Sequence, residues 1–80
     1  MSDLMEHVRA EALFVSGLQR SAGPAPDEVR RAVAGAIREY GSPGCAALVA
    51  LEFGEHPETA VARMVWAIDA VRTSFPLPQD

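Results

Sequence analysis

The sequence contains no lysine, and positive charge as a whole is scarce in it. Its seven basic residues are all arginines, 11 residues are acidic, and the formal net charge is −4. An acidic chain on average opposes nucleic acids and anionic membrane surfaces, although a local basic patch can override that average. The composition therefore favours a protein partner and disfavours, without excluding, a nucleic acid; we expect no membrane association.

Cysteine is equally scarce. Cys45 is the single cysteine, so no disulfide can form within the chain and no cage of thiolate ligands can be completed around a metal. This usage fits a reducing compartment. The opening residues, MSDLMEHVRAE, lack the basic and apolar blocks of a signal peptide, and no stretch approaches membrane-spanning length. We therefore expect a cytoplasmic protein.

Signatures of enzymes are missing as well. The chain has no glycine-rich phosphate loop, and Gly54 interrupts the run EFGEH. As a result Glu52, Glu55 and His56 cannot share one helical face as the residues of a zinc-protease motif do. Cys45 lies in the first turn of an expected helix, where a thiol can be activated, but without a basic neighbour we expect a small buried residue. We expect no enzymatic activity, no metal and no cofactor.

What the chain does have is a hydrophobic content of 49%, heavy in alanine and valine and arranged with helical periodicity. Its 80 residues suffice for a single domain, 1–80, with a small core. Proline and glycine divide the periodic segments from one another. The sequence predicts an all-α, compact four-helix domain with short Pro/Gly connectors, its helices at 3–19, 26–40, 43–53 and 57–74, followed by an extended tail at 76–80.

The expected helix ends depend on local signals. Asp3 and Glu6 have the spacing of a capping box. Pro26 and Pro57 suit the first position of a helix, because proline lacks an amide proton and presets the backbone angle φ. Gly41 suits the left-handed residue that often terminates a helix.

The expected helices differ in apolar character. In the first, apolar residues extend well beyond a single stripe, so this helix needs more than one neighbour. In the last, an apolar stripe consists of Val61, Met64, Val65, Ile68, Val71 and Phe75. We expect this stripe to face the core and the last helix, as the longest, to be the central one.

Trp66 lies more than a quarter-turn away from that stripe. A tryptophan flanked by small residues is typical of an interface anchor, because aromatic side chains dominate the energetics of contact surfaces. The alternative is that the first helix covers it. Since the core is small, we favour an interaction surface through which the protein binds a protein partner or itself as a homodimer. The expected surface consists of Trp66, Ala62, Asp69 and Ala70.

A concentrated positive surface is expected on the second helix, formed by Arg30, Arg31 and Arg38. Guanidinium groups bind planar anions through two parallel hydrogen bonds, so this stripe could hold a phosphate or an acidic partner. A charged face opposite an apolar one is also what an ordinary solvated helix shows.

Residues 46–66 resemble a helix-turn-helix motif. In that family an alanine and, four residues later, a glycine precede a short turn and a recognition helix, and Ala50 and Gly54 match these two positions. The resemblance implies a DNA-binding regulator in which Thr59 and Arg63 contact DNA. Acidic residues in and after the turn would repel phosphates. DNA binding is therefore the alternative, second to protein interaction.

More of the chain is similar to small helical proteins of actinobacteria. The similarity lies in the segments ALFVSGLQ and GCAALVALEFGEHPETAVARMVWA, joined by an arginine-rich middle helix, and the alanine, valine and arginine bias suits a GC-rich genome. It implies no activity and no site. The function expected from the sequence is a small, non-enzymatic protein-protein interaction or regulatory module that self-associates through its last helix.

Overall fold

The protein is all-helical and compact. The computed structural model describes residues 4–76 and contains no strand within them. Its elements are α1 (Leu4–Val15), the short 3-10 helix η1 (Arg20–Ala22), α2 (Pro26–Glu55) and α3 (Pro57–Ser74). None of these helices is long and apolar enough to cross a bilayer. The expected cap at Asp3 and the expected tail beyond Pro76 lie outside the described residues.

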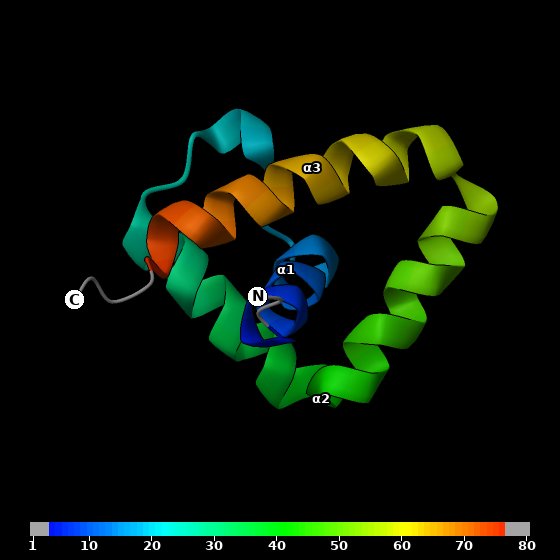
Figure 1. Ribbon diagram of the computed structural model, residues 1–80, viewed down its shortest axis with the longest axis horizontal. Helices are drawn as coiled ribbons and strands as arrows, with labels where there is room; N and C mark the ends of the chain where they lie inside the picture. The colour runs from blue at the N-terminus through cyan, green and yellow to red at the C-terminus, as the bar shows by residue number, and fades with distance from the viewer. Residues whose placement is uncertain (1–3, 77–80) are drawn as a thin grey trace.

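The helix in the middle of the fold is α1. Figure 1 shows it end-on, inside a frame made by α2 and α3, and it contacts both of them. Its buried residues are Ala10, Ala12, Leu13 and Phe14. The wide apolar arc of the first helix thus correctly predicted several neighbours. The expectation that the last helix is central is wrong, because α3 covers α1 with one face and leaves the other to solvent.

A sharp kink divides α2 at Gly41. The backbone angles there are φ 71° and ψ 163°, in a region that is essentially restricted to glycine. Pro43 follows two residues later inside the same helix, where it cannot donate a backbone hydrogen bond. The kink gives α2 two arms, 26–40 and 42–55, which lie on different sides of α1 (Figure 1).

The expected count of four helices is wrong. The predicted helices 26–40 and 43–53 are the two arms of α2, since helical structure resumes directly after Gly41 with no connector between them. The glycine at position 41 was sufficient to predict that the helix is interrupted there. It could not tell a kink within one helix from the end of one helix and the start of another.

The buried face of α3 matches the expected one in part. Val71 is buried and Met64, Ile68 and Phe75 pack against the core, as predicted, whereas Val61 and Val65 of the predicted stripe are 53% and 64% exposed and Ala60 and Ala67 are buried instead. The small alanine side chains allow α3 to approach its neighbours closely. Because α3 is apolar on more than one side, its periodicity could not indicate where the buried face ends.

Aromatic side chains connect α1 to both α2 and α3. The rings of Phe14 and Phe53 are stacked, with centroids 6.0 Å apart and planes inclined by 18°. The guanidinium of Arg9 lies 4.2 Å from the centre of the Phe75 ring at the end of α3. These contacts extend the core cluster outward from α1 toward the ends of its two neighbours.

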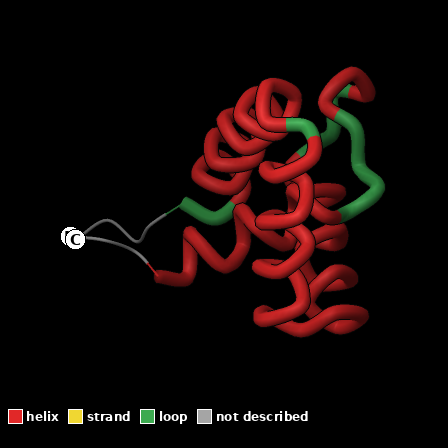
Figure 2. The backbone as a smooth tube through the Cα atoms, turned by 90° about the vertical axis from the view of Figure 1, so that its right-hand side faces the viewer, coloured by secondary structure: helices red, strands yellow, loops and turns green. Residues whose placement is uncertain are grey.

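The connection between α2 and α3 consists of His56 alone. Figure 2 shows it as a tight bend between two helices of different direction. Pro57 occupies the first position of α3, as predicted from the sequence. A DNA-binding helix-turn-helix has a longer turn of about three or four residues. Residues 46–66 therefore form a pair of crossed helices with a shorter connection than that motif uses.

We expect alanine at Gly41 and at Gly35 to have opposite effects on stability. Gly41→Ala forces a side chain onto a backbone conformation that only glycine adopts easily, so the free energy of unfolding should fall by about 1–3 kcal/mol. Gly35 lies within the first arm of α2, with open space where the Cβ of an alanine would lie. Gly35→Ala should raise stability by about 0.5–1 kcal/mol. Urea unfolding followed by far-UV circular dichroism measures both, and equal effects would contradict the kink.

We also expect Cys45 to be unreactive in the folded protein. Its side chain is 1% exposed, and Sγ lies 3.8 Å from the carbonyl oxygen of Ala36. Burial, with a smaller contribution from Glu11, raises the pKa of the thiol, which lowers the fraction of reactive thiolate. Labelling by a disulfide reagent at pH 8 should be slower than in urea by roughly 100-fold or more. Rapid labelling with unchanged circular dichroism would show that Cys45 is accessible.

Candidate interaction surface

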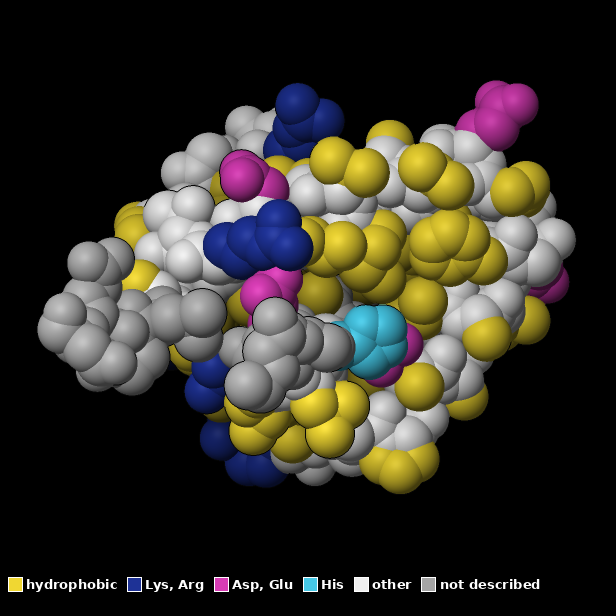
Figure 3. Space-filling model, in the orientation of Figure 1, with side chains coloured by type: hydrophobic (Ala, Val, Ile, Leu, Met, Phe, Trp, Pro, Cys, Tyr) yellow, Lys and Arg dark blue, Asp and Glu magenta, His cyan; other side chains and the backbone are white. Residues whose placement is uncertain are grey.

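The side of α3 that faces away from α1 carries the apolar side chains most exposed on that helix. We call it the outer face of α3 and define it by Val61, Ala62, Val65, Trp66 and Asp69. The two valines are more than half exposed, Ala62 and Asp69 are exposed, and Trp66 is half-buried. Figure 3 shows hydrophobic side chains along the length of α3, with charged ones toward its ends. These neighbouring exposed apolar side chains make the outer face of α3 the candidate interaction surface.

Trp66 lies at one edge of the outer face, between two grooves of about 480 and 520 Å³. The first groove is also lined by Arg20, Val65, Ile68, Asp69 and Arg72, and the second by Gln19, Arg20, Ser21, Thr59, Ala62 and Arg63. The segment beside Trp66 is thus the linker that contains η1, and α1 does not line either groove. Trp66 is half-buried and packs against the hydrophobic core, to which α1 contributes, and this linker lines the grooves on its open sides.

The residues expected to surround Trp66 do not all share its surface. Ala62 and Asp69 are exposed on the outer face, next to Trp66. Ala70 is half-buried and packs against the hydrophobic core, as Trp66 itself does on its inner side. The structure therefore places Val61 and Val65 on the surface where the sequence suggested Ala70.

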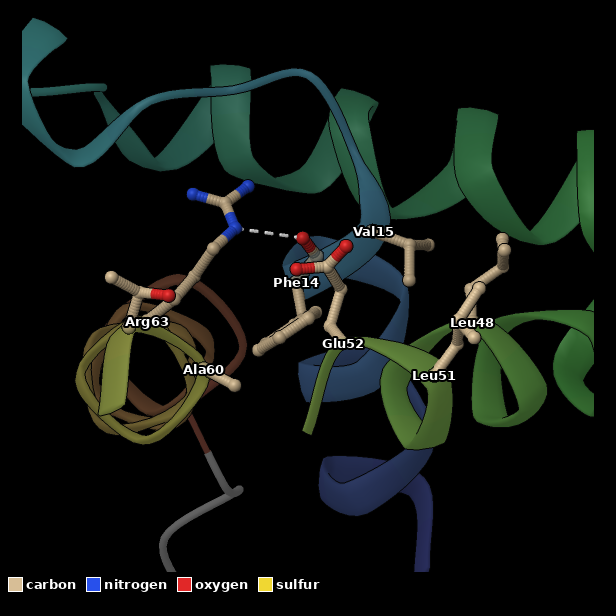
Figure 4. A pocket seen from close by; sticks show the side chains of 8 residues that line it. Phe14, Val15, Leu48, Leu51, Glu52, Ala60 and Arg63 are labelled. Carbon is tan, nitrogen blue, oxygen red and sulfur yellow. Dashed lines mark hydrogen bonds between the residues drawn. The ribbon is translucent and has the colours of Figure 1, made fainter. Parts of the chain in front are cut away.

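Arg63 reaches from α3 to the end of α1. Its Nε donates a hydrogen bond to the carbonyl oxygen of Phe14 at 2.8 Å, as Figure 4 shows. Its Nη2 lies 3.0 Å from the carbonyl oxygen of Ser16, 2.9 Å from that of Leu18 and 3.4 Å from that of Leu13. One guanidinium thus serves four backbone acceptors where α1 stops.

These bonds explain how α1 can end inside the fold. The last carbonyls of a helix have no partner within the helix and need donors from elsewhere. The helix ends at Val15, before the predicted end at residue 19, and the Ser16 hydroxyl donates to the carbonyl oxygen of Leu13 at 2.7 Å. Arg63 supplies the donor for Phe14 and a further, longer contact to Leu13. Burial lowers the pKa of Arg63, but the ordinary pKa of arginine is so high that the group stays charged.

Arg63 also contacts two aromatic rings. Its guanidinium carbon lies 5.1 Å from the centre of the Trp66 ring and 5.8 Å from that of Phe14. Cation–π contacts of this length are attractive, the more so where solvent is partly excluded. Arg63 therefore helps to fix the orientation of Trp66 at the edge of the outer face. Sequence reasoning missed this role: Gly17 stands where a glycine cap would follow α1, but its φ is not positive, and no local pattern shows that a donor comes from α3.

The structure gives Thr59 and Arg63, the residues expected to contact DNA, different surroundings. Thr59 is exposed, and its hydroxyl donates to the carbonyl oxygen of His56 at 3.2 Å. Arg63 could reach a base edge only by releasing its four carbonyl partners. The exposed side chains near the tight bend include Glu55 and Glu58, which would repel phosphates. The surroundings of these four residues therefore disfavour DNA binding.

The arginines of the expected anion-binding stripe separate into two kinds. Arg30 forms an ion pair with Asp27 and donates from Nη1 to the carbonyl oxygen of Ser74 at 3.0 Å, which joins the start of α2 to the end of α3. Arg31 and Arg38 are exposed, and within residues 4–76 neither has a hydrogen-bond or ion-pair partner. They remain available to an anion, but Arg30 already has structural partners.

Another hollow, of about 300 Å³, lies where the three helices meet (Figure 4). It is lined by Phe14, Val15, Leu48, Leu51, Glu52, Thr59, Ala60 and Arg63. Its walls are mainly apolar, and the donors of Arg63 already bind the backbone. A catalytic site needs several polar groups that converge on one point. The lining residues of this hollow do not provide such a set.

We expect the loss of the Arg63 donors to destabilise the fold. Arg63→Met keeps an unbranched side chain of similar length but leaves the carbonyls at the end of α1 without a charged donor, so the free energy of unfolding should fall by about 2–3 kcal/mol. Arg38→Met removes an exposed arginine of α2 and should change stability by less than about 0.5 kcal/mol. Urea unfolding monitored by circular dichroism compares the two variants. Equal stabilities would mean that Arg63 is not needed at the end of α1.

Comparison with known proteins adds nothing to these observations: no family model, curated protein or solved structure matches this chain.

Proposed function

We propose that this protein is a small, non-enzymatic interaction or regulatory module that self-associates as a homodimer through the outer face of α3. The observation that carries the proposal is the pair of exposed valines beside a half-buried tryptophan on one helix face. Val61 and Val65 are 53% and 64% exposed, although equally apolar residues elsewhere on α3 are buried. A partner that covered them would remove this apolar surface from water.

The size of the protein supports the same proposal. The hydrophobic core consists mostly of alanine and valine side chains, with Leu13 and Phe14 as the large members. A domain of this length buries a modest fraction of its surface when it folds alone, so additional burial against a partner stabilises it appreciably. Self-association provides that burial.

Trp66 is suited to the edge of such an interface. Its indole is held by the guanidinium of Arg63, so little side-chain entropy is lost on binding. Grooves on both sides leave room for side chains of a second molecule. Tryptophan is among the residues that contribute most to binding free energy at protein contacts.

We expect the protein to dimerise and the outer face to be responsible. Val65→Ser replaces an apolar side chain that is already exposed, so it should preserve the fold while weakening self-association by about tenfold or more, the effect of losing roughly 1.5 kcal/mol of apolar burial. Leu51→Ser is the matched control, because Leu51 is 54% exposed but lies on α2. Sedimentation equilibrium over a range of concentrations measures the dissociation constant of each variant.

A monomer at every concentration would overturn the proposal. If Val65→Ser and Leu51→Ser weakened dimerisation equally, the outer face of α3 would be ruled out as the interface. Salt-sensitive binding of random duplex DNA in a mobility-shift experiment would instead favour the helix-turn-helix alternative. Trp66 emission adds a local readout, because closure of the interface should shift the emission to shorter wavelength as the dimer forms.

A further inference from the structure

Three residues on the exposed side of α3 follow one another at intervals of seven. They are Glu58 near the start of the helix, Val65 in its middle and Arg72 in its last turn. Seven residues make almost two full turns, so these side chains lie nearly on one line along the helix. All three are exposed. The line is therefore acidic at one end, apolar in the centre and basic at the other end.

The two charged ends of this line have capacity to bind a further partner. Arg72 donates from Nε to Glu6 of α1 at 2.6 Å, and its side chain is still 67% exposed. Within residues 4–76 its Nη atoms have no acceptor, and Glu58 has no ion-pair partner. A guanidinium can bind two carboxylates at once, because it carries five N–H donors.

We infer that two copies of the chain pair through α3 in antiparallel orientation, with the two Val65 side chains facing each other on the twofold axis. This inference rests on the proposed self-association and specifies its geometry. In this pairing residue 58 of one copy lies opposite residue 72 of the other, because both are seven positions from the axis. Glu58 of each copy then meets Arg72 of its partner, twice in the dimer.

The charges select this orientation over the parallel one. In a parallel pair the two Glu58 carboxylates would lie opposite each other, as would the two Arg72 guanidinium groups, and like charges that face each other are destabilising. A twofold axis also makes the same patch serve both copies, so a single line of residues is complementary to itself. Ala62 of each copy lies opposite Ile68 of its partner, which continues the apolar contact beside Val65, and Val61 lies opposite Asp69.

Disulfide cross-linking tests the geometry directly. The unsubstituted chain is the background and the control, because its single thiol, Cys45, is buried. Val65→Cys should give a covalent dimer on mild oxidation, since the two thiols face each other. Val61→Cys alone should not, because the two copies of residue 61 are displaced by about 12 Å along the helices. An equimolar mixture of Val61→Cys and Asp69→Cys should cross-link, since these positions lie opposite each other.

Charge reversal tests the ends of the line. Glu58→Arg should weaken dimerisation by about tenfold at low salt, because it turns two attractive contacts into repulsive ones. Arg72→Glu should weaken dimerisation similarly. The double variant that carries both Glu58→Arg and Arg72→Glu should regain most of the lost affinity. Glu55→Arg is the matched control: it changes the charge by the same amount on an exposed residue that lies off the line, and it should have little effect.

The outcomes separate this geometry from the proposed function. Cross-linking by Val65→Cys and by the mixture, together with rescue in the double variant, supports the antiparallel pair. A sedimenting dimer in which Val61→Cys alone cross-links would show a parallel pair and overturn the geometry while leaving self-association in place. A sedimenting dimer with no cross-link at any of these positions would place the interface away from this line. A protein that sediments as a monomer would overturn both.

Discussion

The hydrogen bonds from Arg63 to the end of α1 are the interaction on which the arrangement of the fold depends. The first helix is buried on several sides, and a single guanidinium on α3 donates to the carbonyls of Leu13 and Phe14 at its end and of Ser16 and Leu18 just beyond it. Fixing Arg63 toward α1 also fixes the rotation of α3 about its own axis. Val61 and Val65, two residues to either side of Arg63, consequently face outward, which is why an apolar surface remains exposed.

The second constraint is the kink at Gly41. A single straight helix of the length of α2 could cover only one side of α1, whereas the kink allows its two arms to cover two sides. The third side belongs to α3. The positive φ at Gly41 therefore determines how much of α1 is enclosed. The Arg72–Glu6 salt bridge and the Arg9–Phe75 cation–π contact are additional contacts between α1 and α3 at the edge of the core.

Sequence reasoning could predict the features that depend on neighbouring residues and failed on those that depend on distant ones. Pro57 and Gly41 act within one turn of helix, so the start of α3 and the change of direction in α2 could be predicted. The partners of Arg63 lie 45 to 50 residues away in the chain, and no local pattern contains them. The buried side of α3 was predicted only in part for the same reason: Val71 is buried as expected, but Val61 is exposed and its neighbour Ala60 is buried, which depends on contacts with the other helices.

The position of α1 in the middle of the fold has a consequence for synthesis on the ribosome. Since α1 precedes α2 and α3 in the chain, it is synthesised before the helices that enclose it, and Arg63 follows its partner Phe14 by 49 residues. When α1 emerges, both its apolar surface and its C-terminal carbonyls therefore lack their final partners. This fold is completed only when α3 has left the exit tunnel, so α1 depends on a helix synthesised after it for its protection.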